Sequence, residues 1–217
     1  MTNHDSDGFF EGDAEERSEL AWTEQDWERY LAAQAQAVRT YAAHYDRLGA
    51  ASDRIDQVAR LMGWETAELD AADRPIEEDA ADAEFSDDWE PYTTQCNPVY
   101  IASHALQSQL ATEWERIVAS TPALPAPGAL RVQSALHLQQ IQSLHAIQAL
   151  EMGDYILAVC FFKRALRALN ETLAALEAAG PGRELADFRL WARPRLFDLR
   201  EIWLRVMAEC RVESDGD

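Results

Sequence analysis

The sequence is poor in lysine and cysteine, and it has no long hydrophobic run. Lys163 is the only lysine among 19 basic residues, which together with abundant alanine suits a GC-rich microbial genome or a salt-adapted organism. Cys96, Cys160 and Cys210 lie far apart without any C-x-x-C spacing, so we expect neither a disulfide framework nor a zinc knuckle. The apolar runs are much shorter than the roughly 18 residues that span a bilayer, so no membrane partner is expected.

The motifs that usually reveal catalysis or targeting are also missing. The chain contains no Gly-x-Ser-x-Gly elbow, phosphate-binding loop, dinucleotide fingerprint or zinc-peptidase histidine pair. Its first residues, MTNHDSDGFFEGDAEERSE, are acidic and lack the apolar core of a signal or transit peptide. We therefore expect a cytoplasmic protein, for which a binding function is favoured over enzyme activity.

Acidic residues outnumber basic ones and are unevenly distributed. The 217 residues include 39 acidic and 19 basic ones, for a net charge of −20. Residues 1–97 hold 25 of the acidic and 7 of the basic residues, whereas residues 98–217 are nearly neutral. Nucleic-acid binding is not expected, because contacts to phosphates require a basic surface. The distribution is typical of an interaction or solubilising segment joined to a more neutral domain.

A heptad pattern predicts a long helix near the N-terminus. From Trp27 to Met62, the positions of the seam follow one another in alternating steps of four and three residues, mostly with apolar side chains. Thr23, followed by acidic residues, predicts the start of a helix over 24–62, in which Gly49 is the point for a bend or a break. The aromatic residues of this seam suggest a homodimer formed through the helix.

Apolar spacing and helix breakers predict four further helices, and hence an all-α helical bundle of about five helices. Asn97 and Pro98 are typical of a helix start, and the proline-rich stretch 121–128 is expected to connect two helices. Pro194 should kink or interrupt the last helix near Ala192. The last three helices are expected to form a compact antiparallel unit with the first two packed along it. The four further helices cover 98–119, 129–152, 154–179 and 183–211.

Acidic residues with interspersed aromatic ones separate the first helix from the others. Self-repulsion and scarce large apolar residues predict an extended segment over 64–91. It is open whether this segment is a linker pinned to its own domain, a docking motif or an inhibitory flap. The predicted organisation is an acidic disordered tail (1–21), an amphipathic helix (22–63), an acidic linker (64–96), a bundle domain (97–211) and a disordered tail (212–217).

One helical hairpin carries a recognisable pattern. Gly153, Tyr155, Ala158, Phe162 and Ala165 have the glycine, aromatic and small residues of the turn and second helix of a tetratricopeptide repeat. Residues 136–169 thus resemble one such hairpin. The first helix departs from the motif, which has Trp, Leu and Tyr where this chain has Gln142, His145 and Ala149. The resemblance implies protein or peptide binding.

Histidines provide the alternative to a binding function. None has an acidic residue three positions before it, so the Glu-x-x-His pair of di-iron bundles is absent, and no cofactor is expected. They are either hydrogen-bonded core or boundary residues, or together a metal site of a bundle enzyme or metal-binding protein. Of the cysteines, Cys96 is interpreted as an ordinary thiol and Cys160 as a core residue. The candidate metal ligands are His44, His104, His137 and His145.

Arginines crowd the last two predicted helices in an otherwise acidic chain. Acidic residues interleave with them, which is typical of a solvated, salt-bridged face. The functional interpretation is a surface for an acidic partner, including the chain's own 64–91 segment, because a guanidinium can pair with carboxylates through two contacts. The leading hypothesis is a non-enzymatic protein–protein interaction or adaptor protein. Its candidate partner-binding residues are Arg189, Arg193, Arg195 and Arg200.

Overall fold

The structure, a computed structural model, describes residues 22–64, 93–122 and 124–215. Within these ranges it is all-α, with six α-helices, one short 3-10 helix and no strand. The chain divides into two compact units, residues 1–36 and residues 37–217. The predicted N-terminal tail and residues 65–92 of the predicted linker lie outside the described residues.

The first unit contains the N-terminal part of helix α2 (Glu24–Leu48). Thr23 and Asp26 cap this helix reciprocally: the Asp26 amide donates to Thr23 Oγ1 at 3.3 Å, and the Thr23 amide donates to Asp26 Oδ2 at 3.1 Å. The predicted helix start at residue 24 is therefore confirmed. The rings of Trp22, Trp27 and Tyr30 lie against one another, with centroids 5.2 to 5.9 Å apart.

The second unit begins with the rest of α2, and α2 ends where a glycine follows it. Gly49 has a φ of +59°, which side chains with a Cβ rarely adopt, and α3 (Arg54–Leu61) starts five residues later. The predicted helix over 24–62 is thus two helices, broken at the residue that the sequence suggested. A homodimer through this segment stays a prediction.

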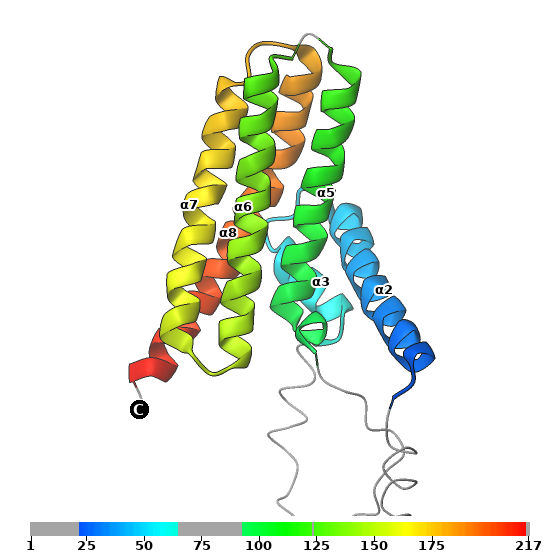
Figure 1. The fold of residues 1–217 in the computed structure, drawn as a ribbon, viewed down its shortest axis with the longest axis vertical. Helices are drawn as coiled ribbons and strands as arrows, with labels where there is room; N and C mark the ends of the chain where they lie inside the picture. The colour runs from blue at the N-terminus through cyan, green and yellow to red at the C-terminus, as the bar shows by residue number, and fades with distance from the viewer. Residues whose placement is uncertain (1–21, 65–92, 123, 216–217) are drawn as a thin grey trace, which may run out of the picture. The chain divides into compact units, whose positions relative to one another are not determined.

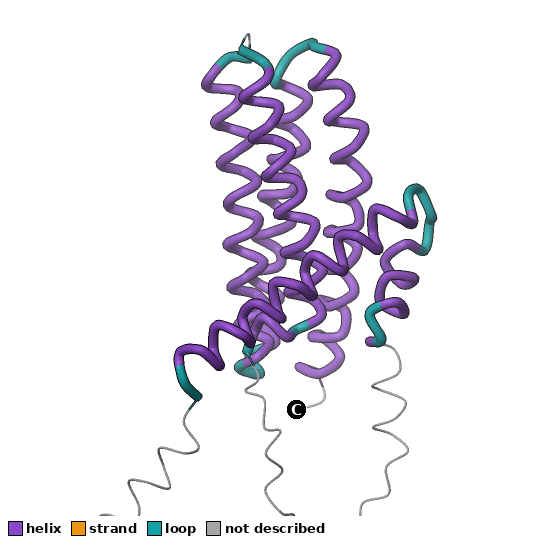
Figure 2. The backbone as a smooth tube through the Cα atoms, turned by 90° about the vertical axis from the view of Figure 1, so that its right-hand side faces the viewer, coloured by secondary structure: helices purple, strands orange, loops and turns teal. Residues whose placement is uncertain are grey.

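Four long helices form a closed bundle in the second unit (Figures 1 and 2). Consecutive helices run antiparallel and are joined by short connections; each packs on two neighbours, α5 on α6, α6 on α7, α7 on α8 and α8 on α5. The last three helices are antiparallel as expected, and α5, which was expected to pack along them, closes the ring as a fourth helix of the bundle. The short η1 (Thr94–Cys96) precedes α5 (Pro98–Ser120), α6 (Ala126–Glu151), α7 (Tyr155–Ala178) and α8 (Arg183–Asp215).

Side-chain caps mark the starts of α5 and α7. Asn97 Oδ1 accepts from the amide of Val99 at 2.9 Å, and Asp154 Oδ1 accepts from the amide of Leu157 at 2.9 Å. Helix α6 begins three residues before its predicted start at 129. The reason is that Pro127 lies in the first turn, where a missing N–H costs no hydrogen bond.

Helix α8 differs most from its prediction. It continues through Pro194 without interruption, although the proline leaves the Leu190 carbonyl without its i+4 donor. Ala192, Leu196 and Leu199 around it are fully buried, so tertiary packing outweighs a penalty of about 3 kcal/mol. The helix also extends to Asp215, so the predicted disordered tail over 212–217 is wrong for its first four residues.

The bundle interior is apolar and contains large aromatic side chains. Trp114 and Trp203 are fully buried, and Trp203 Nε1 donates to Ser103 Oγ at 3.0 Å across to α5. The predicted seam of α7 is confirmed, because it faces this interior through Phe162 and its heptad neighbours. Cys160 was expected in the core, but it is exposed, because it lies on the opposite side of α7 from Phe162.

Two glutamines in the bundle are buried in different ways. Gln107 Nε2 donates to Ser143 Oγ at 3.0 Å. Gln139 is fully buried, and neither polar atom of its amide has a hydrogen-bond partner among the described residues. A buried polar group without a partner costs about 1–3 kcal/mol, so these residues should contribute to stability with opposite signs.

We expect Gln139→Met to raise the free energy of unfolding by about 1 kcal/mol or more, because it removes two unpaired polar atoms at nearly constant volume. Gln107→Met, the matched control, should lower it by about 1 kcal/mol through loss of the bond to Ser143. Urea denaturation followed by circular dichroism measures both changes. Shifts of the same sign in the two variants would contradict this account.

Candidate functional site

A carboxylate on α8 fixes the α2–α3 corner to the bundle. Asp198 Oδ2 accepts from Arg54 Nε at 3.0 Å and from the Tyr45 hydroxyl at 2.7 Å, and Arg54 Nη2 also donates to it. The Arg54 guanidinium lies over the Tyr45 ring, 4.1 Å from its centroid. Only 9% of the Arg54 side chain and 21% of the Asp198 side chain are exposed, so this ion pair is largely shielded from water.

A second arginine, which lies on α8, also joins this corner to the bundle. Arg195 on α8 donates through Nη2 to Asp46 Oδ1 at 2.5 Å and through Nε to Gln109 Oε1 at 3.0 Å. Its guanidinium stacks on Trp191, 3.8 Å from the ring centroid. We call Tyr45, Asp46, Arg54, Arg195 and Asp198 the polar latch, because together they join α2, α3 and α8.

The surroundings of the latch keep its tyrosine protonated. Burial, the hydrogen bond to Asp198 and the charge of that carboxylate raise the pKa of Tyr45 well above its ordinary value of 10.0. Burial, and then the Asp198 charge, raise the pKa of Tyr41, whose ring stacks on those of Tyr45 and Trp64. The Tyr45 hydroxyl therefore stays a hydrogen-bond donor at alkaline pH, where an ordinary tyrosine loses its proton.

The four arginines predicted to bind a partner fall into two pairs. Arg195 belongs to the latch, and Arg189 caps the end of α7 by donating to the carbonyls of Leu176 at 2.8 Å and Gly180 at 2.6 Å. Arg193 and Arg200 are exposed, and neither forms an ion pair or a side-chain hydrogen bond with any described residue. Two of the predicted residues thus stabilise the fold, and two are free to contact a ligand.

The two free arginines lie along a row of exposed apolar side chains. Leu190, Phe197 and Leu204 are 75%, 44% and 38% exposed, and they recur every seven residues along α8. No other helix in the described ranges carries three exposed large apolar side chains. We call these three residues together with Arg193 and Arg200 the α8 ridge.

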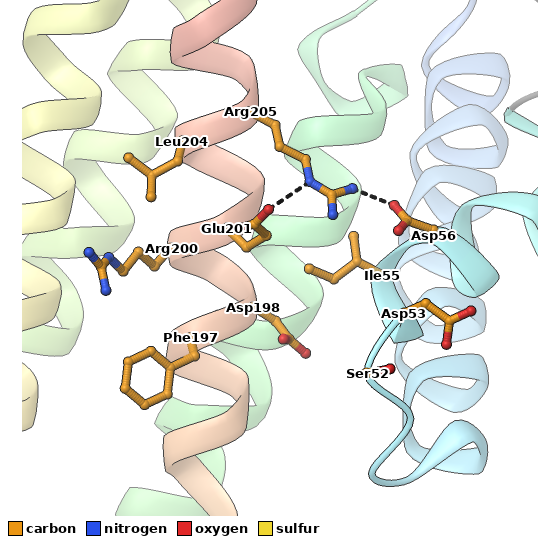
Figure 3. Close-up of a pocket in the computed structure, with 10 residues that line it drawn as sticks. All are labelled: Ser52, Asp53, Ile55, Asp56, Phe197, Asp198, Arg200, Glu201, Leu204 and Arg205. Atoms are coloured by element: carbon orange, nitrogen blue, oxygen red, sulfur yellow. Dashed lines mark hydrogen bonds and ion pairs between the residues drawn. The ribbon is translucent and has the colours of Figure 1, made fainter.

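A pocket of about 490 Å³ lies between the α3 region and α8, and Phe197, Arg200 and Leu204 of the ridge are among the residues that line it. Figure 3 shows Phe197, Arg200 and Leu204 on the side of α8 that points away from α3, whereas Asp198, Glu201 and Arg205 lie on the side toward it. Three of the four acidic groups that line the pocket have an arginine partner: Arg205 pairs with Asp56 and, at 2.9 Å, with Glu201, and Asp198 pairs with Arg54 of the latch.

A second, wider pocket of about 630 Å³ borders the other end of the ridge. Leu190, Trp191 and Pro194 of α8 form its apolar wall, and latch residues from α2 and α3 form the opposite wall. A small pocket of about 50 Å³ between α7 and α8 lies beside the same leucine and includes Glu177 and Arg193. The ridge is therefore flanked by concave surfaces that a protruding side chain could fill.

The structure does not gather the candidate metal ligands. The His104 ring stacks on Tyr100 with centroids 5.3 Å apart, and the His145 ring contacts Phe161 at 5.2 Å. His44 Nδ1 lies 2.6 Å from Arg47 Nη2, and His137 is exposed on α6. Among the described residues, no three His, Cys, Asp or Glu side chains come together in a group that could hold a metal ion.

Comparison with known proteins yields no match to a protein-family model, to a curated protein or to a solved structure. No helix in the described ranges combines the length and the apolar character needed to cross a bilayer. The function must therefore be inferred from the chemistry of the α8 ridge and the latch. The enrichment of arginine in the last helices was visible in the sequence. The latch was not predicted, because its partners lie about 150 positions apart in the chain.

We expect Asp198→Asn to lower the free energy of unfolding by about 3 kcal/mol, because it leaves the Arg54 charge buried without its counter-ion. Glu201→Gln should cost less than about 1 kcal/mol, because Arg205 is half-exposed and keeps Asp56. Urea denaturation measures both. Adding Arg54→Met to Asp198→Asn should restore part of the lost free energy of unfolding. Equal losses in Asp198→Asn and Glu201→Gln would contradict the larger role assigned to the latch.

Stability should fall as the pH rises above about 10. The unfolded chain loses its tyrosine protons there, whereas Tyr45 keeps its proton in the folded state, so the free energy of the unfolded state falls relative to that of the folded state as the pH rises. Tyr45→Phe removes this contribution and should flatten the decline by up to about 1.4 kcal/mol per pH unit. Thermal unfolding between pH 9 and about 11 tests this, and an unchanged slope in the variant would refute it.

Proposed function

We propose that this protein is a non-enzymatic, cytoplasmic interaction or adaptor protein that binds a partner protein through the α8 ridge. The observation that carries the proposal is the row of Leu190, Phe197 and Leu204, which stand exposed at heptad spacing on one helix. Single exposed apolar residues are common on protein surfaces, whereas an aligned group is typical of an interaction site.

The composition of the ridge favours a protein ligand. Aromatic and arginine side chains are enriched in protein interfaces, and the ridge combines Phe197 with Arg193 and Arg200. Burying three large apolar side chains contributes a few kcal/mol at about 25 cal/mol per Å². That amount is enough to support a reversible complex once the entropy cost of association is met.

The scaffold beneath the ridge is suited to binding without rearrangement. The opposite face of α8 is anchored in the bundle by Leu196, Leu199 and Trp203, all fully buried. The latch additionally holds α2 and α3 beside the pockets that flank the ridge. A preorganised surface of this kind loses little conformational entropy on binding.

The α6–α7 hairpin provides separate support of a weaker kind. Gly153 turns the chain with a φ of +73°, and Ala158, Phe162 and Ala165 are fully buried between helices. These are the residues on which the resemblance to a tetratricopeptide hairpin rests. Such hairpins serve protein or peptide binding, which agrees with the proposal.

Photo-cross-linking in the native host tests the proposed function. We expect that benzoylphenylalanine placed at position 197 will yield a discrete cross-linked product with another protein upon irradiation. The same group at Gln148, an exposed position on α6, is the control and should yield none. The aromatic replacement at Phe197 resembles the native ring, so the fold should be retained.

The proposal fails if position 197 gives no product, or if both positions give the same products. A second variant, Leu190→Gln with Leu204→Gln, should reduce the yield at position 197 strongly, because it removes the outer two apolar contacts. Circular dichroism of this variant checks that the helices are intact. A full yield from the variant would place the binding surface elsewhere on the chain.

A further inference from the structure

We infer that the α8 ridge binds an acidic amphipathic helix of its partner protein. This inference rests on the proposed function and specifies the partner's chemistry. The partner helix would place apolar residues at heptad spacing against Leu190, Phe197 and Leu204. It would place carboxylates beside them, against Arg193 and Arg200.

The seven-residue spacing of the apolar side chains in the ridge favours a helix as the ligand. Leu190 and Leu204 are fourteen residues apart, so they lie about 21 Å apart along a continuous helix at 1.5 Å per residue. A partner helix of three heptads covers this length and can insert its apolar side chains between those of the ridge. The concave surfaces beside Leu190 and beside Phe197 and Leu204 give such side chains room.

The positions of the two arginines favour a partner helix with acidic residues beside its apolar ones. Arg193 follows Leu190 by three residues and Arg200 follows Phe197 by three, so each guanidinium lies on the same face as its apolar neighbour. Neither has a counter-ion among the described residues, although Glu177 lines the small pocket beside Arg193. A carboxylate of the partner helix would supply this counter-ion through two-point contacts with the guanidinium group.

The acidic groups near the ridge are already occupied by other partners. In the pocket that Arg200 lines, Asp56, Asp198 and Glu201 each pair with Arg205 or Arg54. Asp53 Oδ1 accepts a hydrogen bond from the side-chain Nε2 of Gln57 at 2.6 Å. The guanidinium groups of Arg193 and Arg200 therefore remain without a carboxylate partner among the described residues.

The net charge of the chain does not prevent this contact. At about 0.1 M salt, exposed charges farther apart than roughly 10 Å are largely screened, so the groups next to the ridge influence binding more than the net charge of the whole chain does. A second copy of the same surface is a poor ligand, because it would bring arginine against arginine. The charge pattern thus favours a different, acidic chain.

Two synthetic helical peptides of three heptads test the inference. Both carry leucine at the first and fourth heptad positions; one has glutamate at the flanking positions and the other has lysine. Fluorescence anisotropy measures their affinity for the full-length chain. We expect the glutamate peptide to bind at least about tenfold more tightly, as two exposed charge pairs allow, and to weaken as salt is raised.

Charge-reversal variants provide the control. Arg193→Glu with Arg200→Glu should invert the preference in favour of the lysine peptide. Lys163→Glu with Arg167→Glu makes the same change in net charge on the exposed side of α7 and should leave the preference unchanged. Equal affinity for both peptides, or the same preference in the ridge variant as in the wild type, would overturn the inference.

Two further outcomes separate this inference from the proposed function. A cross-linked partner at position 197 combined with no preference for glutamate would retain the interaction site and reject the acidic helix. Binding of the glutamate peptide only after Asp87, Asp88 and Glu90 are replaced by their amides would assign the ridge to the chain's own acidic segment. That result would overturn the inference of a separate partner, and dimerisation blocked by the ridge variant would do the same.

Discussion

The Asp198 carboxylate is the constraint on which the arrangement of the second unit depends. It accepts hydrogen bonds from both Arg54 and Tyr45, and it thereby joins α3 and α2 to α8. A buried ion pair of this kind adds little net stability compared with apolar packing, but it tolerates few alternative positions of its partners. The latch therefore specifies where the α2–α3 corner lies more than it strengthens the fold.

The three sides of helix α8 lie in different environments. Leu196, Leu199 and Trp203 face the bundle interior, Arg195 and Asp198 face the latch, and Phe197 with its heptad neighbours stays exposed. A helix buried on two sides is held firmly, which makes its third side a rigid surface. The binding function proposed for the α8 ridge follows from this division, because rigid exposed apolar groups lose little entropy on binding.

The arginines of α8 illustrate which features of the candidate site could be predicted from the sequence. Their enrichment in the last helices was visible, and Arg193 and Arg200 are indeed exposed. Arg189 and Arg195 look the same in the sequence, yet they cap α7 and bind Asp46. Whether an arginine is structural depends on the acceptors that tertiary packing brings to it, and those acceptors cannot be read from local spacing.

The sequence by itself determined the all-α class, the inward faces of α7 and α8 and the break at Gly49, because periodicity, capping and backbone freedom are local properties. Only the tertiary structure decided that α5 closes the bundle, that α8 continues through Pro194 and that Cys160 is exposed. It alone also formed the latch. These features depend on packing between distant segments, whose free energy exceeds the local preferences of a proline or an arginine.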